Sequence, residues 1–156
     1  MQPYSQFEAD VEPKSAVHTL PLQYHTGPHY SGMVEVGTAV KRFFVELDLN
    51  FDDLLITNKD CLDTENTACP SKESYDEAES STAENLGLKR KKQSHVEVKG
   101  AGIDIIGIEY TDKVCLGPTK DGCFEPQRFV SVTTERTTYG PYDGILGLGP
   151  NADSLF

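Results

Sequence analysis

The sequence has no tryptophan and few basic residues: 14 lysines and arginines stand against 25 aspartates and glutamates in 156 residues. The resulting formal charge of −11 repels phosphate, so nucleic acid is not expected as a partner. No apolar run approaches the roughly 18 residues that a membrane-spanning helix requires. The opening MQPYSQFEAD also lacks the apolar core of a signal peptide. Either the chain is cytosolic, or a leader was removed before the numbering begins.

Sequence patterns of several common enzyme sites are missing as well. There is no GxSxG motif, no P-loop and no HExxH motif, and the glycines at 142–149 do not have dinucleotide-binding spacing. Zinc sites commonly use CxxC pairs; no such pair is present, and the four histidines lie far from the cysteines in sequence. We therefore expect neither a metal nor a cofactor.

The four cysteines form two near pairs, Cys61 with Cys69 and Cys115 with Cys123. Three pairings are possible, and we expect the local one, because each bond would then close a short hydrophilic loop. Each such bond would stabilise the fold by about 2.5 kcal/mol through loop entropy. Both would imply an oxidising compartment, so that the protein would be secreted or reside in the lumen of the secretory pathway. The alternative is four reduced, partly buried thiols.

The apolar residues alternate as they do in β-strands. Val34 and Val36 share one strand face, and in the next strand Val45, Leu47 and Leu49 do the same. Further strands are expected at 54–56, 96–99, 103–116 and 128–134, with a turn at 100–102 and a glycine-punctuated apolar segment at 142–149. No long helical periodicity is present. The pattern predicts a mainly β domain, of barrel or sandwich type.

Residues 58–92 change to a polar, acidic composition, which predicts a long surface excursion with a short helix near 77–84. The basic run at 89–92 fits a solvated loop, with a localisation signal or a docking patch as alternatives. Residues 151–156 read as a helix start that Asp153 or Ser154 could cap. The length suits one domain, residues 1–156. Because it ends where an element begins, we expect a fragment or one chain of a processed pair.

The order of these segments resembles that of the pepsin-like aspartic proteases. The family's first motif, YxGxIxIGTPPQxFxVxxDTGSSxLWV, is similar to YSGMVEVGTAVKRFFVELDLNFDDLLI at 30–56. Its FDPxxSST segment, which follows a small disulfide loop, is similar to YDEAESST at 75–82. Its flap pattern, YGxGSxxG, is similar to KGAGIDII at 99–106, with Gly107 one place late. Its FDGILGLG segment is similar to YDGILGLG at 142–149.

The resemblance covers nearly the whole chain and implies the N-terminal lobe of the pepsin-like acid-protease β-barrel fold. In that family each of two lobes supplies one aspartate, and the pair shares a proton around a bound water. Asp48 corresponds to the first aspartate, and no second motif follows, so this chain lacks a dyad of its own. The resemblance places the flap at Lys99, Gly100, Ala101, Gly102, Ile103 and Asp104. We expect Gly144, Gly147 and Gly149 to allow close backbone packing beneath the aspartate loop.

The catalytic motif departs from the family at several positions. Leu49 replaces a threonine whose hydroxyl helps to tie the lobes together, and Phe51 replaces a serine that hydrogen-bonds the carboxylate. Asn50 replaces a glycine that permits a tight turn, although asparagine also tolerates left-handed geometry. The family's flap tyrosine and the tryptophan that it contacts correspond to Lys99 and Leu55. These losses predict that Asp48 is vestigial; the alternatives are a working catalytic group and a plain turn residue.

Two functions follow from this pattern. The first is a catalytically inactive pseudoprotease lobe that serves in binding or assembly. Its partners would be a C-terminal pepsin-like lobe, from the same precursor or a separate chain, and an extended peptide held by strand pairing. The second is the N-terminal half of a divergent but active aspartic endopeptidase, with a homodimer that uses Asp48 twice as a variant. A structural subunit of a larger assembly is a third, more distant interpretation.

Overall fold

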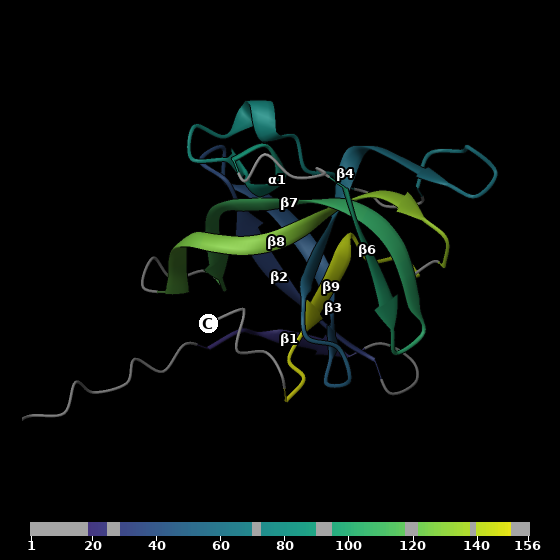
Figure 1. Ribbon diagram of the computed structural model, residues 1–156. Helices are drawn as coiled ribbons and strands as arrows, with labels where there is room; N and C mark the ends of the chain where they lie inside the picture. The colour runs from purple at the N-terminus through teal and green to yellow at the C-terminus, as the bar shows by residue number, and fades with distance from the viewer. Residues whose placement is uncertain are drawn as a thin grey trace, which may run out of the picture.

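Strands dominate the structure, a computed structural model that describes residues 19–24, 29–69, 73–89, 95–117, 122–137 and 140–150 (Figure 1). The strands are β1 (Leu22–Tyr24), β2 (Tyr30–Val36), β3 (Lys41–Asp48), β4 (Leu54–Asp63), β5 (Glu84–Asn85), β6 (His95–Gly100), β7 (Ile103–Leu116), β8 (Cys123–Glu135) and β9 (Gly144–Gly147). The helical elements are a 3-10 turn, η1 (Glu77–Glu79), and one short helix, α1 (Leu86–Lys89). The mainly β prediction is confirmed. No described helix has the length and apolar character needed to cross a bilayer.

The sheet closes into a barrel. Its strand order is β1-β2-β3-β9-β4-β8-β7-β5, with β6 pairing to β7 outside that path. A further antiparallel pairing joins β2 to β7, with Val34 opposite Leu116 and Val36 opposite Val114. Strands β2, β3, β9, β4, β8 and β7 therefore form a closed ring. Of the two architectures predicted from the alternation, the barrel is the correct one.

Strand β9 enters the sheet between β3 and β4, parallel to the first and antiparallel to the second (Figure 1). Its register places Gly147 opposite Asp48 and Gly144 opposite Val45. A side chain at Gly144 would put its Cβ 2.0 Å from the carbonyl oxygen of Leu55. The absence of a side chain there allows the last strand to lie between two strands that follow one another in sequence.

The barrel wall separates two buried apolar clusters. Alternation along β2 and β3 sends Val34, Val36 and Val45 into the first cluster, as predicted, together with Phe43, and all four are buried. The second cluster contains Phe51, Leu55, Cys61, Ile103, Ile105, Val130, Val132, Tyr142 and Ile145. The expectation for Leu49 was wrong: β3 ends at Asp48, so Leu49 lies in the following turn and is 71% exposed.

The predicted surface excursion at 58–92 needs correction. Strand β4 continues through Asp63 instead of ending near residue 56, and Tyr75 is only 2% exposed. The predicted helix at 77–84 is replaced by η1, capped by Asp76, then by β5, with α1 beginning only at Leu86. Strand β8 likewise begins at Cys123 rather than 128. The expectations for 90–92 and 151–156 lie outside the described residues.

Asp112 is the reason that this segment is held against the barrel. Its carboxylate is fully buried and accepts hydrogen bonds from the hydroxyls of Tyr75 at 2.8 Å, Ser80 at 2.9 Å and Thr82 at 2.5 Å. The backbone N–H of Lys113 also donates to it, at 2.7 Å. Burial raises the pKa of the Tyr75 phenol, and the hydrogen bond to Asp112 adds to that shift. Tyr75 therefore remains protonated and keeps donating. Side-chain hydroxyls, which favour local turns, here form a tertiary contact and interrupt the expected helix.

Replacing Asp112 by alanine should lower the free energy of unfolding by about 3 kcal/mol or more, because one buried and three partly buried donors lose their acceptor. Urea denaturation measures the change. Glu97→Ala, which removes an exposed carboxylate paired with Arg136, serves as the control and should cost less than about 1 kcal/mol. Equal losses in the two variants would contradict the role assigned to Asp112.

The turn between β2 and β3 contains a strained residue. Val40 has a φ of 54°, a left-handed conformation that costs a side chain with a Cβ about 1–2 kcal/mol, and it is 55% exposed. Glycine has no such penalty but loses more chain entropy on folding, so Val40→Gly should stabilise the fold by about 0.5–1 kcal/mol. Thermal unfolding checks this value. Val40→Ala keeps the Cβ and should gain less; the reverse ranking would show that the turn is unstrained.

Candidate functional site

Asp48, the last residue of β3, carries a partly exposed carboxylate. The backbone N–H of Asn50 donates to its Oδ1 at 2.8 Å. A backbone N–H therefore reaches the carboxylate even though Asn50 stands where the family has glycine. Asn50 achieves this without left-handed geometry, because Val40, Asn66 and Ala101 are the non-glycine residues of the described chain with positive φ. The hydrogen bond is also the one by which an aspartate stabilises an ordinary turn.

Backbone hydrogen bonds from the end of β9 hold the loop that follows Asp48. Leu148 donates its N–H to the carbonyl of Asp48 at 2.8 Å, and Gly149 donates to that of Phe51, also at 2.8 Å. A Cβ on Gly147 would lie 2.4 Å from the carbonyl oxygen of Phe51. The prediction that these glycines allow close packing beneath the aspartate loop is confirmed for Gly147 and Gly149, whereas Gly144 packs against Leu55 of β4.

Phe51 turns inward from this loop. It is 7% exposed and belongs to the second buried cluster, together with Leu55, Tyr142 and Ile145, of which Ile145 lies in β9. A phenyl ring cannot donate a hydrogen bond to the neighbouring carboxylate, as the family's serine does. Within the described residues, the donor that contacts the Asp48 side chain is the N–H of Asn50.

The predicted flap is the tip of a β-hairpin. Strands β6 and β7 pair from His95 opposite Ile108 to Gly100 opposite Ile103, with Ala101 and Gly102 as the two-residue loop. Both loop residues have positive φ, 49° and 82°, as the preferred type of two-residue hairpin turn requires. The hairpin lies at the right of the barrel in Figure 1.

Charged groups hold this hairpin near its tip. Arg136 donates to Glu97 at 3.2 Å and to Asp104 at 3.3 Å, and the Lys99 ammonium lies 3.9 Å from Asp104. Leu55, at the position of the family's tryptophan, is fully buried. The aromatic contact that the family uses to position its flap is thus replaced by ion pairing along the hairpin.

Two charged groups near Asp48 were missed by sequence reasoning. Glu46 lies two residues earlier, on the same face of β3, and its carboxylate contacts the imidazole of His29. Arg128 of β8 donates to Asp53 at 2.6 Å and to Glu109 at 2.7 Å. Burial lowers the pKa of the Arg128 guanidinium, but the bonds to Asp53 and Glu109 outweigh that effect and leave it raised. The pairing of β2 with β3, of β7 with β8 and of β4 with β8 brings these residues together, so no local pattern reveals the pairs.

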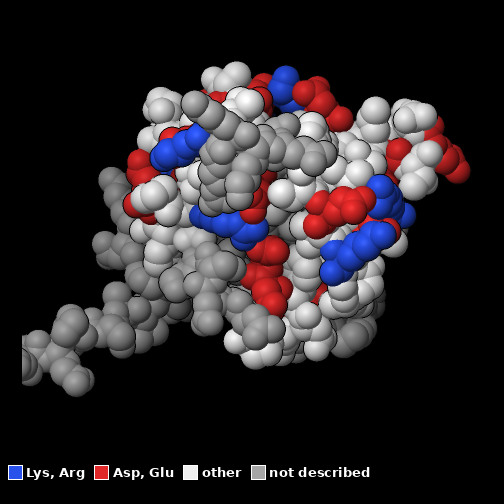
Figure 2. Space-filling model, in the orientation of Figure 1, with Lys and Arg blue, Asp and Glu red and all other residues white. Residues whose placement is uncertain are grey.

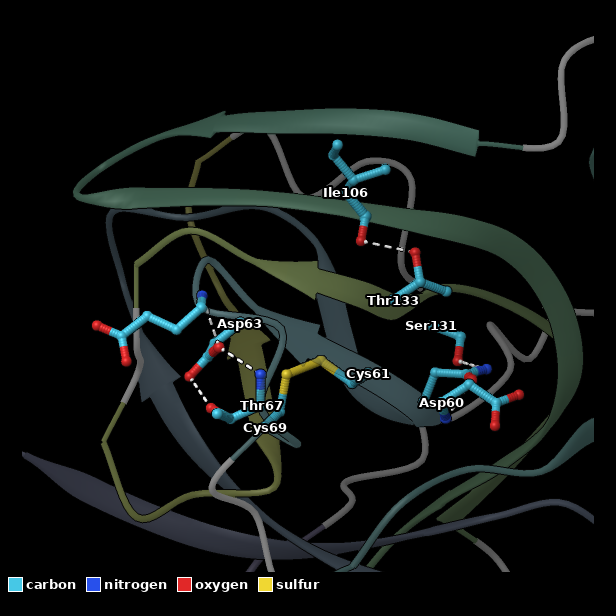
Figure 3. The surroundings of a disulfide bond; sticks show 10 residues. Asp60, Cys61, Asp63, Thr67, Cys69, Ile106, Ser131 and Thr133 are labelled. Atoms are coloured by element: carbon cyan, nitrogen blue, oxygen red, sulfur yellow. Dashed lines mark hydrogen bonds between the residues drawn. A yellow bond between two sulfur atoms is a disulfide. The ribbon is translucent and has the colours of Figure 1, made fainter.

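Both predicted disulfides are present, Cys61–Cys69 and Cys115–Cys123. In the first loop Asp63 accepts hydrogen bonds from the hydroxyl of Thr67 and from its N–H (Figure 3). These two contacts lower the pKa of the Asp63 carboxyl. The sulfurs of Cys61 and Cys69 lie near the Glu135 carboxylate. They are joined to each other and are not thiolates, so this group cannot serve as a metal site.

A surface cleft of about 750 Å³ lies away from Asp48. It is lined by Ala39, Val40, Lys41, Arg42, Glu73 and Glu79. Its β3 residues lie at the start of that strand, roughly 20 Å from the Asp48 end by the rise of a β-strand. The cleft is therefore separate from the carboxylate.

On the face shown in Figure 2, lysine and arginine side chains occur in small groups bordered by aspartate and glutamate.

Gly147→Ala should destabilise the protein by about 3 kcal/mol, because the new methyl group would overlap the backbone of the aspartate loop, which cannot move easily. Gly102→Ala is the matched control. It has open space around the added methyl group and should cost only the left-handed penalty of about 1–2 kcal/mol. Chemical denaturation of both variants gives the comparison. A Gly147 variant as stable as the Gly102 variant would show that the glycine is not needed for packing.

Comparison with known proteins places this geometry in a family. A family model described as eukaryotic aspartyl protease matches residues 29–155. Vacuolar protease A of Neurospora crassa is 29% identical over 146 residues, which are 92% of this chain and 34% of the relative. Rhizopuspepsin of Rhizopus chinensis is 31% identical over 143 residues, 89% of this chain and 33% of the relative. The chain thus spans about a third of the length of these curated relatives. Because the family model covers most of the sequence and the strands that surround Asp48, this chain belongs to the eukaryotic aspartyl protease family.

Proposed function

We propose that this chain is a pseudoprotease lobe: a pepsin-like half-molecule that binds a partner and does not hydrolyse peptides. The observation that carries the proposal is the burial of Phe51 beside Asp48. The motif position that should supply a hydroxyl to the carboxylate instead supplies a ring to an apolar core.

The chemistry of the family supports an inactive site. Two carboxyl groups close together cannot both ionise, and the shared proton lets one act as a base and the other as an acid. This chain offers Asp48 as its one candidate. Leu49 and Phe51 provide no hydroxyls for the hydrogen-bonded network that orients such a pair.

The surface beside Asp48 supports assembly with a second lobe. Leu49 is exposed, and Leu148, whose N–H binds the carbonyl of Asp48, is also exposed. Two leucines beside a carboxylate form a surface that a complementary apolar surface would cover. The partner would be a C-terminal pepsin-like lobe, from the same precursor or from another chain.

An extended peptide is the second expected partner. In the described residues β6 pairs on one side with β7, so its other edge can accept a strand. Backbone pairing of this kind needs no catalytic dyad. The two disulfides support a secreted or lumenal location, since such bonds persist in oxidising compartments.

The competing function is an active but divergent endopeptidase of which this chain is the N-terminal half. The observation that favours it is the N–H of Asn50, which still donates to the carboxylate as an active loop would require. It needs a second aspartate from another lobe, and it needs a loop that works without hydroxyl donors.

Peptide hydrolysis separates the two functions. The product of the full-length reading frame, assayed with a mixed peptide library from pH 3 to 7, should cleave no faster than its Asp48→Asn variant. Loss of a catalytic group that acts in a dyad would instead lower the rate by about 10⁴-fold or more. Cleavage that Asp48→Asn abolishes, and that a transition-state analogue blocks, would reject the pseudoprotease proposal in favour of the endopeptidase.

A further inference from the structure

The barrel is closed on one side by a short seam between β2 and β7. The two strands are joined by three residue pairs, whereas β2 and β3 are joined by six. Cys115 belongs to the middle pair of the three. At one end, the N–H of Gly37 donates to the carbonyl of Lys113 at 2.9 Å. Residues 34–37 and 113–116 together form this seam, which is small enough to open without the rest of the sheet.

On its other edge, the same end of β7 is held by the start of β8. The register between β7 and β8 shifts between Asp112 and Val114. Beyond the shift the strands are joined by two residue pairs, of which Cys115 with Cys123 is the last. A disulfide links these two residues. The bond therefore fixes the end of β7 between β2 and β8, at a point where backbone pairing alone is short.

The two cysteines of this bond differ in exposure. Cys115 is 7% exposed, and Cys123, the first residue of β8, is partly exposed. A thiolate that attacks the bond would therefore approach from the side of Cys123, and Cys115 would be the leaving group.

The second disulfide lies elsewhere. Cys61 belongs to β4 and Cys69 to the loop that follows it, so neither residue is part of the seam. The N–H of Cys69 also donates to the carbonyl of Cys61 at 3.1 Å. Each bond joins cysteines eight positions apart, so the two close loops of equal length and remove similar loop entropy. Their difference is one of position in the barrel.

We propose that the Cys115–Cys123 disulfide is a redox-sensitive clasp on the barrel: the β2–β7 seam is closed while the bond is present and opens when it is reduced, and the rest of the barrel stays folded. A dithiol reductant supplies two electrons and two protons. The S–S bond breaks, two thiols form, and the reductant becomes a cyclic disulfide. The end of β7 then keeps two residue pairs with β8, so the seam opens as a local unit.

Hydrogen exchange of single amides, measured by NMR in the full-length protein, tests the clasp. The Gly37 amide reports on the seam, because its hydrogen bond to Lys113 crosses it. The buried Thr57 amide, which donates to the carbonyl of Asp143 at 2.9 Å, reports on the barrel away from the seam. In the variant Cys115→Ser with Cys123→Ser, exchange of the Gly37 amide should accelerate about tenfold or more relative to that of Thr57.

The matched control is Cys61→Ser with Cys69→Ser, which removes a loop of the same length. It should leave the ratio of the Gly37 and Thr57 exchange rates unchanged. The same variant retains only the clasp, so dithiothreitol added to it reduces that bond alone. The reductant should raise the ratio as the first variant does, and reoxidation with oxidised glutathione should return it to its starting value.

Three results would overturn the clasp: an unchanged Gly37 rate without the bond, equal acceleration of Gly37 and Thr57, or an equal effect of the control variant on the ratio. Should the serine variant not fold, Cys115→Ala with Cys123→Ala, which places no hydroxyl in the buried position, is judged by the same ratio. Failure of both to fold also overturns the proposal, because the rest of the barrel would then depend on the bond. None of these outcomes bears on peptide hydrolysis, so the clasp and the pseudoprotease function stand or fall separately.

Discussion

The insertion of β9 between β3 and β4 is the contact on which the rest of this structure depends. It joins a strand that ends at residue 147 to two strands that lie about a hundred positions earlier, and it closes the barrel between them. Glycines at 144 and 147 make it possible, because a Cβ at either position would overlap the backbone of Leu55 or Phe51. Asp143, just before the strand, completes the contact by accepting the backbone N–H of Phe44 at 2.8 Å.

That contact fixes the loop beside Asp48. The carboxylate lies at the end of β3 with one backbone donor, and the loop beside it is fastened by β9 and by Arg128 through Asp53. A fixed loop is what a catalytic aspartate needs, since preorganisation is what makes such groups effective. Leu49 and Phe51, which follow the carboxylate, supply no hydroxyl groups to it. The scaffold of the family is retained while its polar lining has been exchanged for apolar packing.

Buried charge serves structure elsewhere in the chain. Asp112 collects three hydroxyls and a backbone N–H, and Arg128 bridges two carboxylates across neighbouring strands. Each group is costly to bury alone and is acceptable only because its partners satisfy it. Because each buried charge needs its own partners, these contacts determine which segments of the chain pack against each other. The same argument explains why the segment carrying Tyr75 is packed against the barrel despite its acidic composition.

Local chemistry in the sequence determined the mainly β class, the strand at 103–116, the turn at 100–102 and both disulfide loops, because period-two alternation, glycine placement and short cysteine spacing act over a few residues. Resemblance to a motif located Asp48 and the glycines beneath it. Only the tertiary structure decided that the sheet is a closed barrel, that Phe51 turns inward and that Asp112 and Arg128 find their partners. These outcomes depend on contacts between residues tens of positions apart. Such contacts form when the chain closes, so no local pattern carries them.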